Sequence, residues 1–134
     1  MLAVVDPLEG TNFVINCLVK IHQRCGGNID VVLLEVQRPS REFSNNEGDD
    51  SKILKSVGRR LNSVSIPHRP RFEVGEPAPT IVRCAQEEDC NLIVLAELRT
   101  SSLGLWLATR AGITVGSVAS VIVHLAPIPV LVAR

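Results

Sequence analysis

The chain has 134 residues, enough for one domain with a sizeable core, and we expect residues 1–134 to form that domain. Its 14 basic and 14 acidic residues balance, so no broad charged surface suggests nucleic acid or an anionic membrane as a partner. Hydrophobic residues make up 46% and aromatic residues only 3%, which argues against a base-stacking surface and leaves small aliphatic side chains to fill the core.

The start of the chain predicts two strands joined by a helix. Apolar runs over residues 2–5 and 29–36 are typical of strands that are buried on both faces, and Asp6 stands at the end of the first run. Apolar side chains at helical spacing predict a helix over residues 11–25, which a glycine pair ends. The expected inner face of this helix consists of Phe13, Val14, Cys17, Leu18 and Ile21.

Two further helices have recognisable starts. Ser51 has the side chain of an N-cap. The inner face expected of the helix that follows it consists of Ile53, Leu54, Val57 and Leu61. The other helix opens at Gly75-Glu76-Pro77, because proline is favoured in a first turn. Its expected inner face consists of Ile81, Val82 and Ala85.

The remaining elements complete an alternating pattern. Strands are predicted over residues 69–74, 91–95 and 128–133, and a last helix over 115–125, with an irregular loop over 98–112. Pro67 and Pro70 suggest that the strand over 69–74 lies at an edge or begins there. Strict alternation implies an α/β fold, with a five-stranded parallel, doubly wound, Rossmann-like sheet between two layers of helices.

The cysteines and the hydropathy bear on the compartment. The four cysteines are Cys17, Cys25, Cys84 and Cys90. No two of them have the two-residue gap of a metal or redox motif, so we expect ordinary cytosolic thiols, mostly buried, and no metal site. Residues 113–133 are very apolar, but polar residues and prolines interrupt them. We therefore expect a buried helix and strand, a cytoplasmic protein and no membrane insertion.

Three separated motifs carry a resemblance that spans nearly the whole chain. They are Ala3-Val4-Val5-Asp6, then Gly75-Glu76-Pro77-Ala78 with the strand Cys90-Asn91-Leu92-Ile93-Val94-Leu95, and Gly116-Ser117-Val118-Ala119 with the tail Ala126-Pro127-Ile128-Pro129-Val130-Leu131-Val132. In this order and spacing they resemble the universal stress protein family. The resemblance implies an adenine nucleotide alpha hydrolase-like sheet. It also implies a homodimer, paired through the last strand, Ile128 to Ala133.

The resemblance also implies where a nucleotide would bind. ATP-binding members hold it at the carboxyl edge of the sheet with a motif of Gly, two residues, Gly, nine residues, then Gly followed by Ser or Thr. The residues that correspond to this site are Asp6, Val36, Ala96, Arg99, Gly116, Ser117 and Val118. Ala96 and Arg99 replace the first two glycines, and sixteen residues (100–115) follow Arg99 before Gly116. Glycines let the backbone approach phosphate oxygens, and Arg99 does not reach a positive φ cheaply, so we expect a degenerate site.

Several of these features have a plainer structural interpretation. Asp6 would bind a ribose or an adenine, or it would form a turn before Pro7; the two readings are equally supported. Gly116-Ser117 would hold a phosphate, or it would only cap a helix, which we favour slightly. Trp106, in the long loop, would anchor a protein partner, or it would cover the open edge of the sheet; a short lid helix over residues 103–111 is a further alternative.

These observations predict a regulatory or binding domain without turnover and without a bound cofactor. No base or Mg²⁺ ligand set beyond Asp6 supports an enzyme. The alternative is a stress-response switch that binds ATP or AMP, with or without magnesium. Because only Met1 precedes the first strand, we also expect a domain of a longer protein, such as a transporter or a sensor on its cytoplasmic side.

Overall fold

The computed structural model describes residues 1–6, 10–39, 51–96 and 118–133. The described strands are β1 (Leu2–Val4), β2 (Val31–Gln37), β3 (His68–Val74), β4 (Ile93–Ala96) and β5 (Val130–Ala133). The described helices are α1 (Thr11–Arg24), α2 (Lys52–Ser63), α3 (Pro77–Glu87) and α5 (Val118–Leu125). Strands and helices alternate along the chain as the sequence predicts, and none of the described helices is long and apolar enough to cross a membrane.

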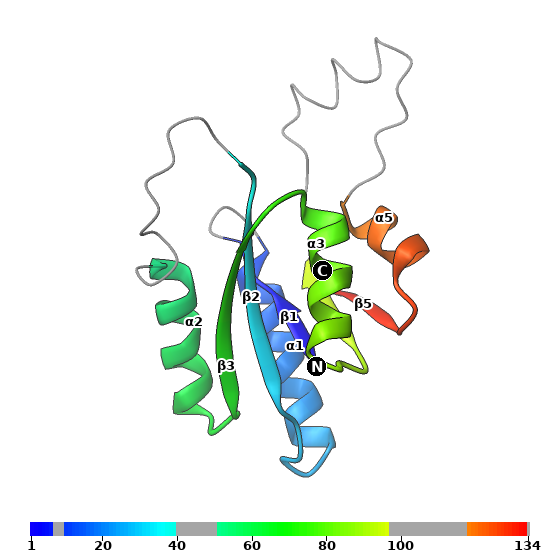
Figure 1. The fold of residues 1–134 in the computed structure, drawn as a ribbon. Coiled ribbons are helices and arrows are strands. Elements are labelled where there is room, and N and C mark those ends of the chain that lie inside the picture. The colour runs from blue at the N-terminus through cyan, green and yellow to red at the C-terminus, as the bar shows by residue number, and fades with distance from the viewer. Residues whose placement is uncertain (7–9, 40–50, 97–117, 134) are drawn as a thin grey trace.

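All five strands are parallel and form one sheet in the order β3-β2-β1-β4-β5. Helices α1 and α2 cover one face, and α3 and α5 cover the other (Figure 1). The α/β fold with a doubly wound, three-layer sheet is therefore confirmed. The chain winds in opposite directions from β1, so the carboxyl ends of β1 and β4 form the topological switch point, where α/β proteins bind ligands.

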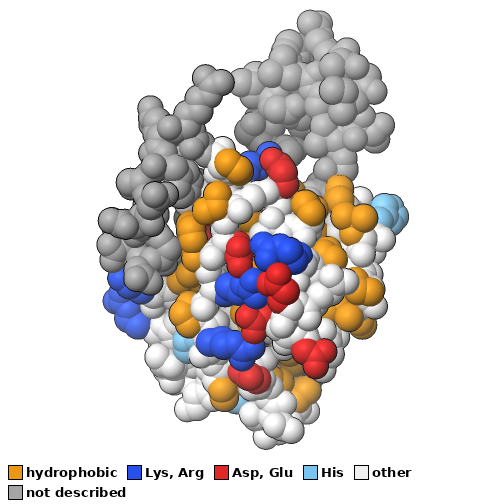
Figure 2. Space-filling view, in the orientation of Figure 1, with side chains coloured by type: hydrophobic (Ala, Val, Ile, Leu, Met, Phe, Trp, Pro, Cys, Tyr) orange, Lys and Arg blue, Asp and Glu red, His pale blue; other side chains and the backbone are white. Residues whose placement is uncertain are grey.

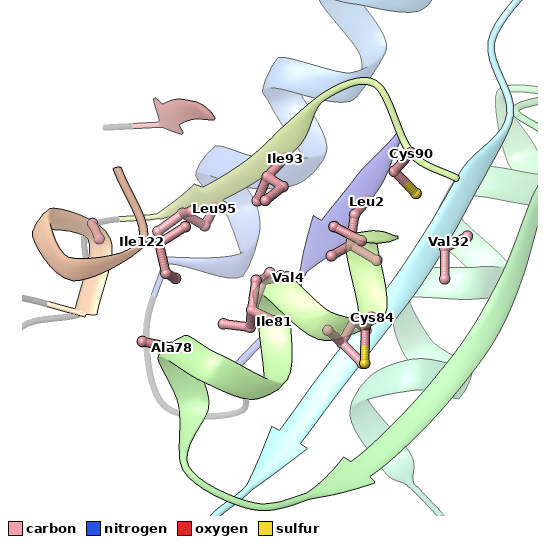
Figure 3. Packing of buried hydrophobic residues seen from close by; sticks show 13 residues of the cluster. Leu2, Val4, Val32, Ala78, Ile81, Cys84, Cys90, Ile93, Leu95 and Ile122 are labelled. Atoms are coloured by element: carbon pink, nitrogen blue, oxygen red, sulfur yellow. The ribbon is translucent and has the colours of Figure 1, made fainter. Parts of the chain in front are cut away.

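The core consists of two aliphatic clusters, one on each face of the sheet. On the α3 and α5 side, Leu2, Ile81, Ile93 and Ile122 are fully buried and meet between the strands and the helices (Figure 3). On the other side, β1 and β2 pack against α1 and α2. The three inner strands, β1, β2 and β4, contribute alternate side chains to the two clusters, which explains why these strands have continuous apolar runs.

The structure differs from the predicted faces of two helices: on α1 a residue expected to be buried is exposed, and on α3 a buried residue was left out. Phe13 is 51% exposed, because the buried face of α1 is centred on Val14, Ile15 and Leu18. Phe13 precedes Val14 by one residue, which rotates its side chain about 100° around the helix axis and toward solvent. On α3, Cys84 is fully buried while Val82 is only partly buried. The predicted inner face of α3 did not include Cys84, although cysteine packs as a small apolar side chain.

β3 is an edge strand, as its prolines suggest. Its face on the α3 side is covered by charged side chains, which Figure 2 shows as a run of blue and red between β3 and α3. Arg71 is the centre of this network and bonds Glu73, Glu87 and Glu88. The network continues through Arg69, Arg83 and Asp30. Long arginine stems thus shield a part of the sheet that no described helix covers.

Candidate functional site at the switch point

Strand register brings three of the predicted site residues to the same edge of the sheet. Val4 lies opposite Leu34 on β2, so continuing the register two residues places Asp6 opposite Val36. On the other side Ala3 lies opposite Val94, which places Ala96 opposite Val5. Asp6 and Val36 are half-buried and Ala96 is buried. The predicted gathering of Asp6, Val36 and Ala96 follows from this pairing.

A short hydrogen-bonded turn closes the connection after β1. The Thr11 hydroxyl donates to the carbonyl oxygen of Asp6 (2.7 Å) and accepts from the Asp6 N–H (3.3 Å). The carbonyl of Gly10 then accepts from the N–H groups of Phe13 and Val14 as α1 begins. Thr11 therefore ties the backbone of Asp6 to the first turn of α1, and it holds Asp6 at the switch point.

Gly10 packs directly against Ala96. A Cβ on Gly10 would lie 2.3 Å from the Cβ of Ala96, and Gly10 has φ +84°, a conformation that favours glycine. Ala96 is only 4% exposed and belongs to the apolar cluster on the α1 side. The methyl group at the position of the first missing glycine is therefore packed against the β1–α1 connection. This contact occupies the α1 side of the switch point with protein atoms.

The start of α3 lies at the same edge of the sheet and explains a second motif. Gly75 follows β3, and its N–H donates to the carbonyl of Gln37 at the end of β2 (2.9 Å). A Cβ on Gly75 would lie 2.6 Å from the hydroxyl oxygen of Thr80, which is buried. Pro77 then opens α3, as predicted. The Gly75 motif therefore serves close packing at the helix start, a structural role.

The remaining predicted site residues divide between described and undescribed parts of the chain. Val118 is half-buried and is the first described residue of α5, packed against the α3-side cluster. Arg99, Gly116 and Ser117 lie outside the described residues, as does Trp106 with the loop over 98–112. Sequence reasoning missed Gly10 and Thr11. A glycine before a helix and a threonine five residues after Asp6 were the available signals.

One group of metal-ligating atoms occurs among the described residues, away from the switch point. Glu73, Cys84 and Glu87 each bring one such atom to within 4.8 Å of the others. Both carboxylates already bond Arg71 and Arg83, whose cations hold the pKa values of Glu73 and Glu87 below the usual range. Burial raises the pKa of the Cys84 thiol, although a metal would need the thiolate. A metal would therefore have to displace two guanidinium groups.

The fold and the position of this site define an α/β protein with a doubly wound parallel sheet and a candidate ligand site at its switch point. The model of the universal stress protein family matches residues 2–134, and the chain belongs to this family. A search of curated proteins finds no match.

Solved structures of universal stress proteins share the fold. The chain is similar to one from Archaeoglobus fulgidus, with a TM-score of 0.72, 19% identity and coverage of 99% of this chain and 96% of that one. A universal stress protein in complex with cAMP gives 0.69, 19%, and coverage of 100% and 97%. An Arabidopsis thaliana family member with AMP bound gives 0.64, 14%, and coverage of 99% and 90%.

Proposed function

We propose that this domain has a regulatory role in which it binds a partner and catalyses no reaction. We also propose that it binds ATP weakly or not at all. The packing of Ala96 supports this proposal. A nucleotide phosphate approaches a glycine backbone closely because no Cβ intervenes. Here the side chain of Ala96 lies against Gly10. The arginine at position 99 adds a second departure from the motif. The domain would act in the cytoplasm, which agrees with its free cysteines, and would regulate a protein to which it is joined.

Nucleotide titration tests the proposal. ATP, ADP and AMP would be titrated by calorimetry, with and without Mg²⁺, and the melting temperature recorded. A ligand at a hundred times its dissociation constant stabilises a fold by about 2.7 kcal/mol. We expect millimolar ATP to stabilise this fold by far less than that. The variant Ala96→Gly with Arg99→Gly should gain affinity for ATP. Its melting temperature without nucleotide controls for the packing lost at Gly10.

The alternative is a switch that binds ATP or AMP. It is favoured by the carboxylate of Asp6 at the switch point and by the similar structures that contain cAMP or AMP. It predicts tight binding by the wild type that Asp6→Ala abolishes. That result would refute the degenerate site, whereas binding that appears only in the double glycine variant would support it.

We further propose that the domain forms a homodimer through β5. Among the described strands its one neighbour is β4, and Leu131 is 36% exposed. The carbonyl of Pro129 accepts from Ile93 on β4 (3.0 Å), so alternation turns the N–H and C=O groups of Val130 and Val132 away from β4. Those groups would pair with the β5 strand of a second copy. The exposed side chains of Val121, Val123 and Leu125 on α5 add apolar surface.

A charge on this edge tests the dimer. Leu131→Lys should give a monomer in sedimentation or light scattering, because a lysine on an edge strand opposes strand addition. Val64→Lys is the control, since Val64 is 40% exposed but lies at the end of α2, beside the opposite edge of the sheet. A wild type that is already monomeric, or a Leu131→Lys variant that remains dimeric, would refute pairing through β5.

A further inference from the structure

The two faces of the sheet differ in how their charges are paired. On the α3 side, Arg69, Arg71 and Arg83 all bond carboxylates. On the other side, helices α1 and α2 contain six lysines and arginines and no aspartate or glutamate. These cations are Lys20 and Arg24 on α1 and Lys52, Lys55, Arg59 and Arg60 on α2. The net charge of zero therefore conceals a separation of charge between the two faces.

Four of these cations have no partner among the described residues. The side chains of Lys20, Arg24, Lys52 and Arg59 make no hydrogen bond or ion pair there, and all four residues are exposed. The other two are engaged: Lys55 has a partner, and Arg60 donates to the neutral side chain of Asn12. The four free cations are thus available to a second molecule.

Helical spacing places the free cations on the outward side of both helices. Successive residues turn about 100° around an α-helix, so Lys52 and Arg59 share one stripe of α2, and Lys20 and Arg24 share one stripe of α1. The opposite side of each helix is buried against the sheet. The bond from Arg60 of α2 to α1 (2.6 Å) joins the two helices, so the two stripes form one surface, here called the basic face.

Helix stability does not explain the basic face. Arg24 and Arg60 lie in last turns, where the helix dipole favours cations, but Lys52 is the first residue of α2, where the dipole opposes them. Lys20 and Arg24 also repel each other, because like charges four residues apart are neighbours on a helix. An anionic partner would turn both of these unfavourable placements into favourable ones.

The carboxylate on the strand beneath α2 does not neutralise this surface. Glu35 of β2 is half-buried and accepts a hydrogen bond from Ser51 at the start of the helix. Asp30, which follows α1, pairs instead with Arg69 on β3 (3.5 Å). Neither carboxylate bonds any of the four free cations.

An exposed phenylalanine belongs to the same surface. Phe13 is 51% exposed and precedes Lys20 by seven residues, so the two share a stripe of α1. An aromatic ring among cations is typical of surfaces that lie on a membrane, where the ring enters the boundary between headgroups and acyl chains. Nucleic acid fits less well, because neither α1 nor α2 contains a second phenylalanine, a tyrosine or a tryptophan on which bases would stack.

We propose that the basic face docks on an anionic lipid surface, with its cations against the headgroups and Phe13 at the boundary with the acyl chains. Cations that are spread over two helices, outside any pocket, match a layer of many headgroups better than a single anionic group. The domain would lie on the membrane and would not cross it. The cytoplasmic leaflet carries anionic lipids, which agrees with the cytoplasmic location proposed above.

Sedimentation with lipid vesicles tests the proposal. The full chain is used, because it includes Glu47, Asp49 and Asp50, which precede α2 in the sequence and lie outside the described residues. It should sediment with vesicles of equal parts phosphatidylserine and phosphatidylcholine, and not with pure phosphatidylcholine. Binding should weaken as the salt concentration rises, because salt screens exposed charges.

A pair of double variants locates the binding surface. Lys20→Gln with Lys52→Gln removes one free cation from each helix and should weaken binding about thirtyfold, since each cation near an anionic membrane contributes about fivefold. Arg69→Gln with Arg83→Gln is the matched control, with the same change in net charge on the opposite face. At physiological salt it should change the affinity less than about twofold, because charges a domain's width away are screened. Melting temperatures show whether each variant is folded.

The aromatic ring is tested separately. Phe13→Ala should weaken binding roughly fivefold at every salt concentration, because the ring contributes apolar burial and no charge. Val74→Ala is the control, since Val74 is 44% exposed at the end of β3, outside the basic face, and it should leave the affinity unchanged. An unaltered affinity in Phe13→Ala would overturn the placement of the ring in the membrane.

Two further probes separate a lipid surface from other anionic partners. Wild type that binds polyglutamate or single-stranded DNA, but not the anionic vesicles, would assign the basic face to an acidic protein or a nucleic acid and overturn the proposal. Equal sedimentation with both kinds of vesicle, or equal losses in the two double variants, would also overturn it. No nucleotide takes part, so failure here is distinguishable from failure of the proposed function.

Discussion

Gly10 shows how one residue fixes the shape of the switch point. It combines a positive φ with a contact that leaves no room for a Cβ, because Ala96 lies on the other side. A glycine in a turn is usually required only because of its positive φ. Here the close contact with Ala96 also requires glycine, and it joins the β1–α1 connection to the end of β4. Both strands contribute to the candidate site.

Gly10→Ala should therefore destabilise the fold more than a turn glycine alone would. Gly26→Ala is the matched control, since Gly26 has φ +65° but nothing within 4 Å of its added Cβ. The control should lose about 1 kcal/mol, the usual strain of a left-handed alanine. Gly10→Ala should lose that amount and roughly 1–3 kcal/mol more from overpacking, measured by urea unfolding. Equal losses in the two variants would show that the contact with Ala96 yields without strain.

The sequence predicted that Asp6 and Ala96 lie at the same edge of the sheet, but it did not predict how this edge is packed. Asp6 and Ala96 stand out because each ends an apolar run, and parallel strands bring such ends together. The contact of Gly10 with Ala96 depends on the register of β1 against β4, two strands almost ninety residues apart. No local pattern carries that register, so the filled α1 side of the switch point was not predictable.

At the scale of elements, the start of α2 is the clearest local signal. The Ser51 hydroxyl accepts from the N–H of Leu54 (3.2 Å) and donates to the carboxylate of Glu35 on β2. The predicted N-cap is confirmed, and the structure adds an acidic group beside the positive end of the helix dipole. Ser51 thus joins α2 to β2, although the two elements are separated by an undescribed segment.

Ser51→Ala should destabilise the protein by about 1 kcal/mol, because the N-cap bond is lost and Glu35 loses its donor. Ser56→Ala is the control: Ser56 is an exposed serine within the same helix, where alanine is the better helix former, so stability should rise by a few tenths of a kcal/mol. Thermal unfolding of both variants measures the difference. A Ser51→Ala variant as stable as Ser56→Ala would mean that the cap is replaced by water.

Element types were predictable because each has a strong local cause, whereas helix faces were less so. Pro77 and Ser51 mark helix starts in the sequence, and both starts are confirmed. The face of α1 was harder, because Phe13, Val14 and Ile15 are consecutive apolar residues and only packing decides between them. The basic face was not predictable either, since its cations come from two helices that only the fold brings together on one side of the sheet.

At the scale of the whole molecule, a network of ion pairs joins β3 to the end of α3 on one face of the sheet. Parallel order follows from alternation alone, and the sequence predicts it well. The network over β3 and α3 depends on which helix lies beside which strand, and Arg71 and Glu88 are seventeen residues apart. Arg71 is only 20% exposed at its side chain, and three carboxylates surround it. This network is the main titrating feature among the described residues.

Acid should weaken the fold through these carboxylates. Bonds from Arg71 lower the pKa values of Glu73 and Glu87 below 4.5 in the folded protein, and Arg69 does the same for Glu88. A depressed folded-state pKa contributes stability above the unfolded value, and that contribution is lost as the pH falls through the folded value. We therefore expect the free energy of unfolding to fall steadily as the pH drops below about 4.5.

Arg71→Gln isolates the network, because Glu73 and Glu87 depend first on Arg71 whereas Glu88 depends first on Arg69. Urea unfolding at a series of pH values should show a shallower acid slope in Arg71→Gln than in the wild type. Some slope should persist, because Glu88 keeps its bond to Arg69. Arg24→Gln, an exposed change at the end of α1, should leave the slope unchanged. An unaltered slope in Arg71→Gln would place the acid sensitivity outside the β3–α3 face, since removing the central cation must raise the pKa values of the carboxyls that depend on it.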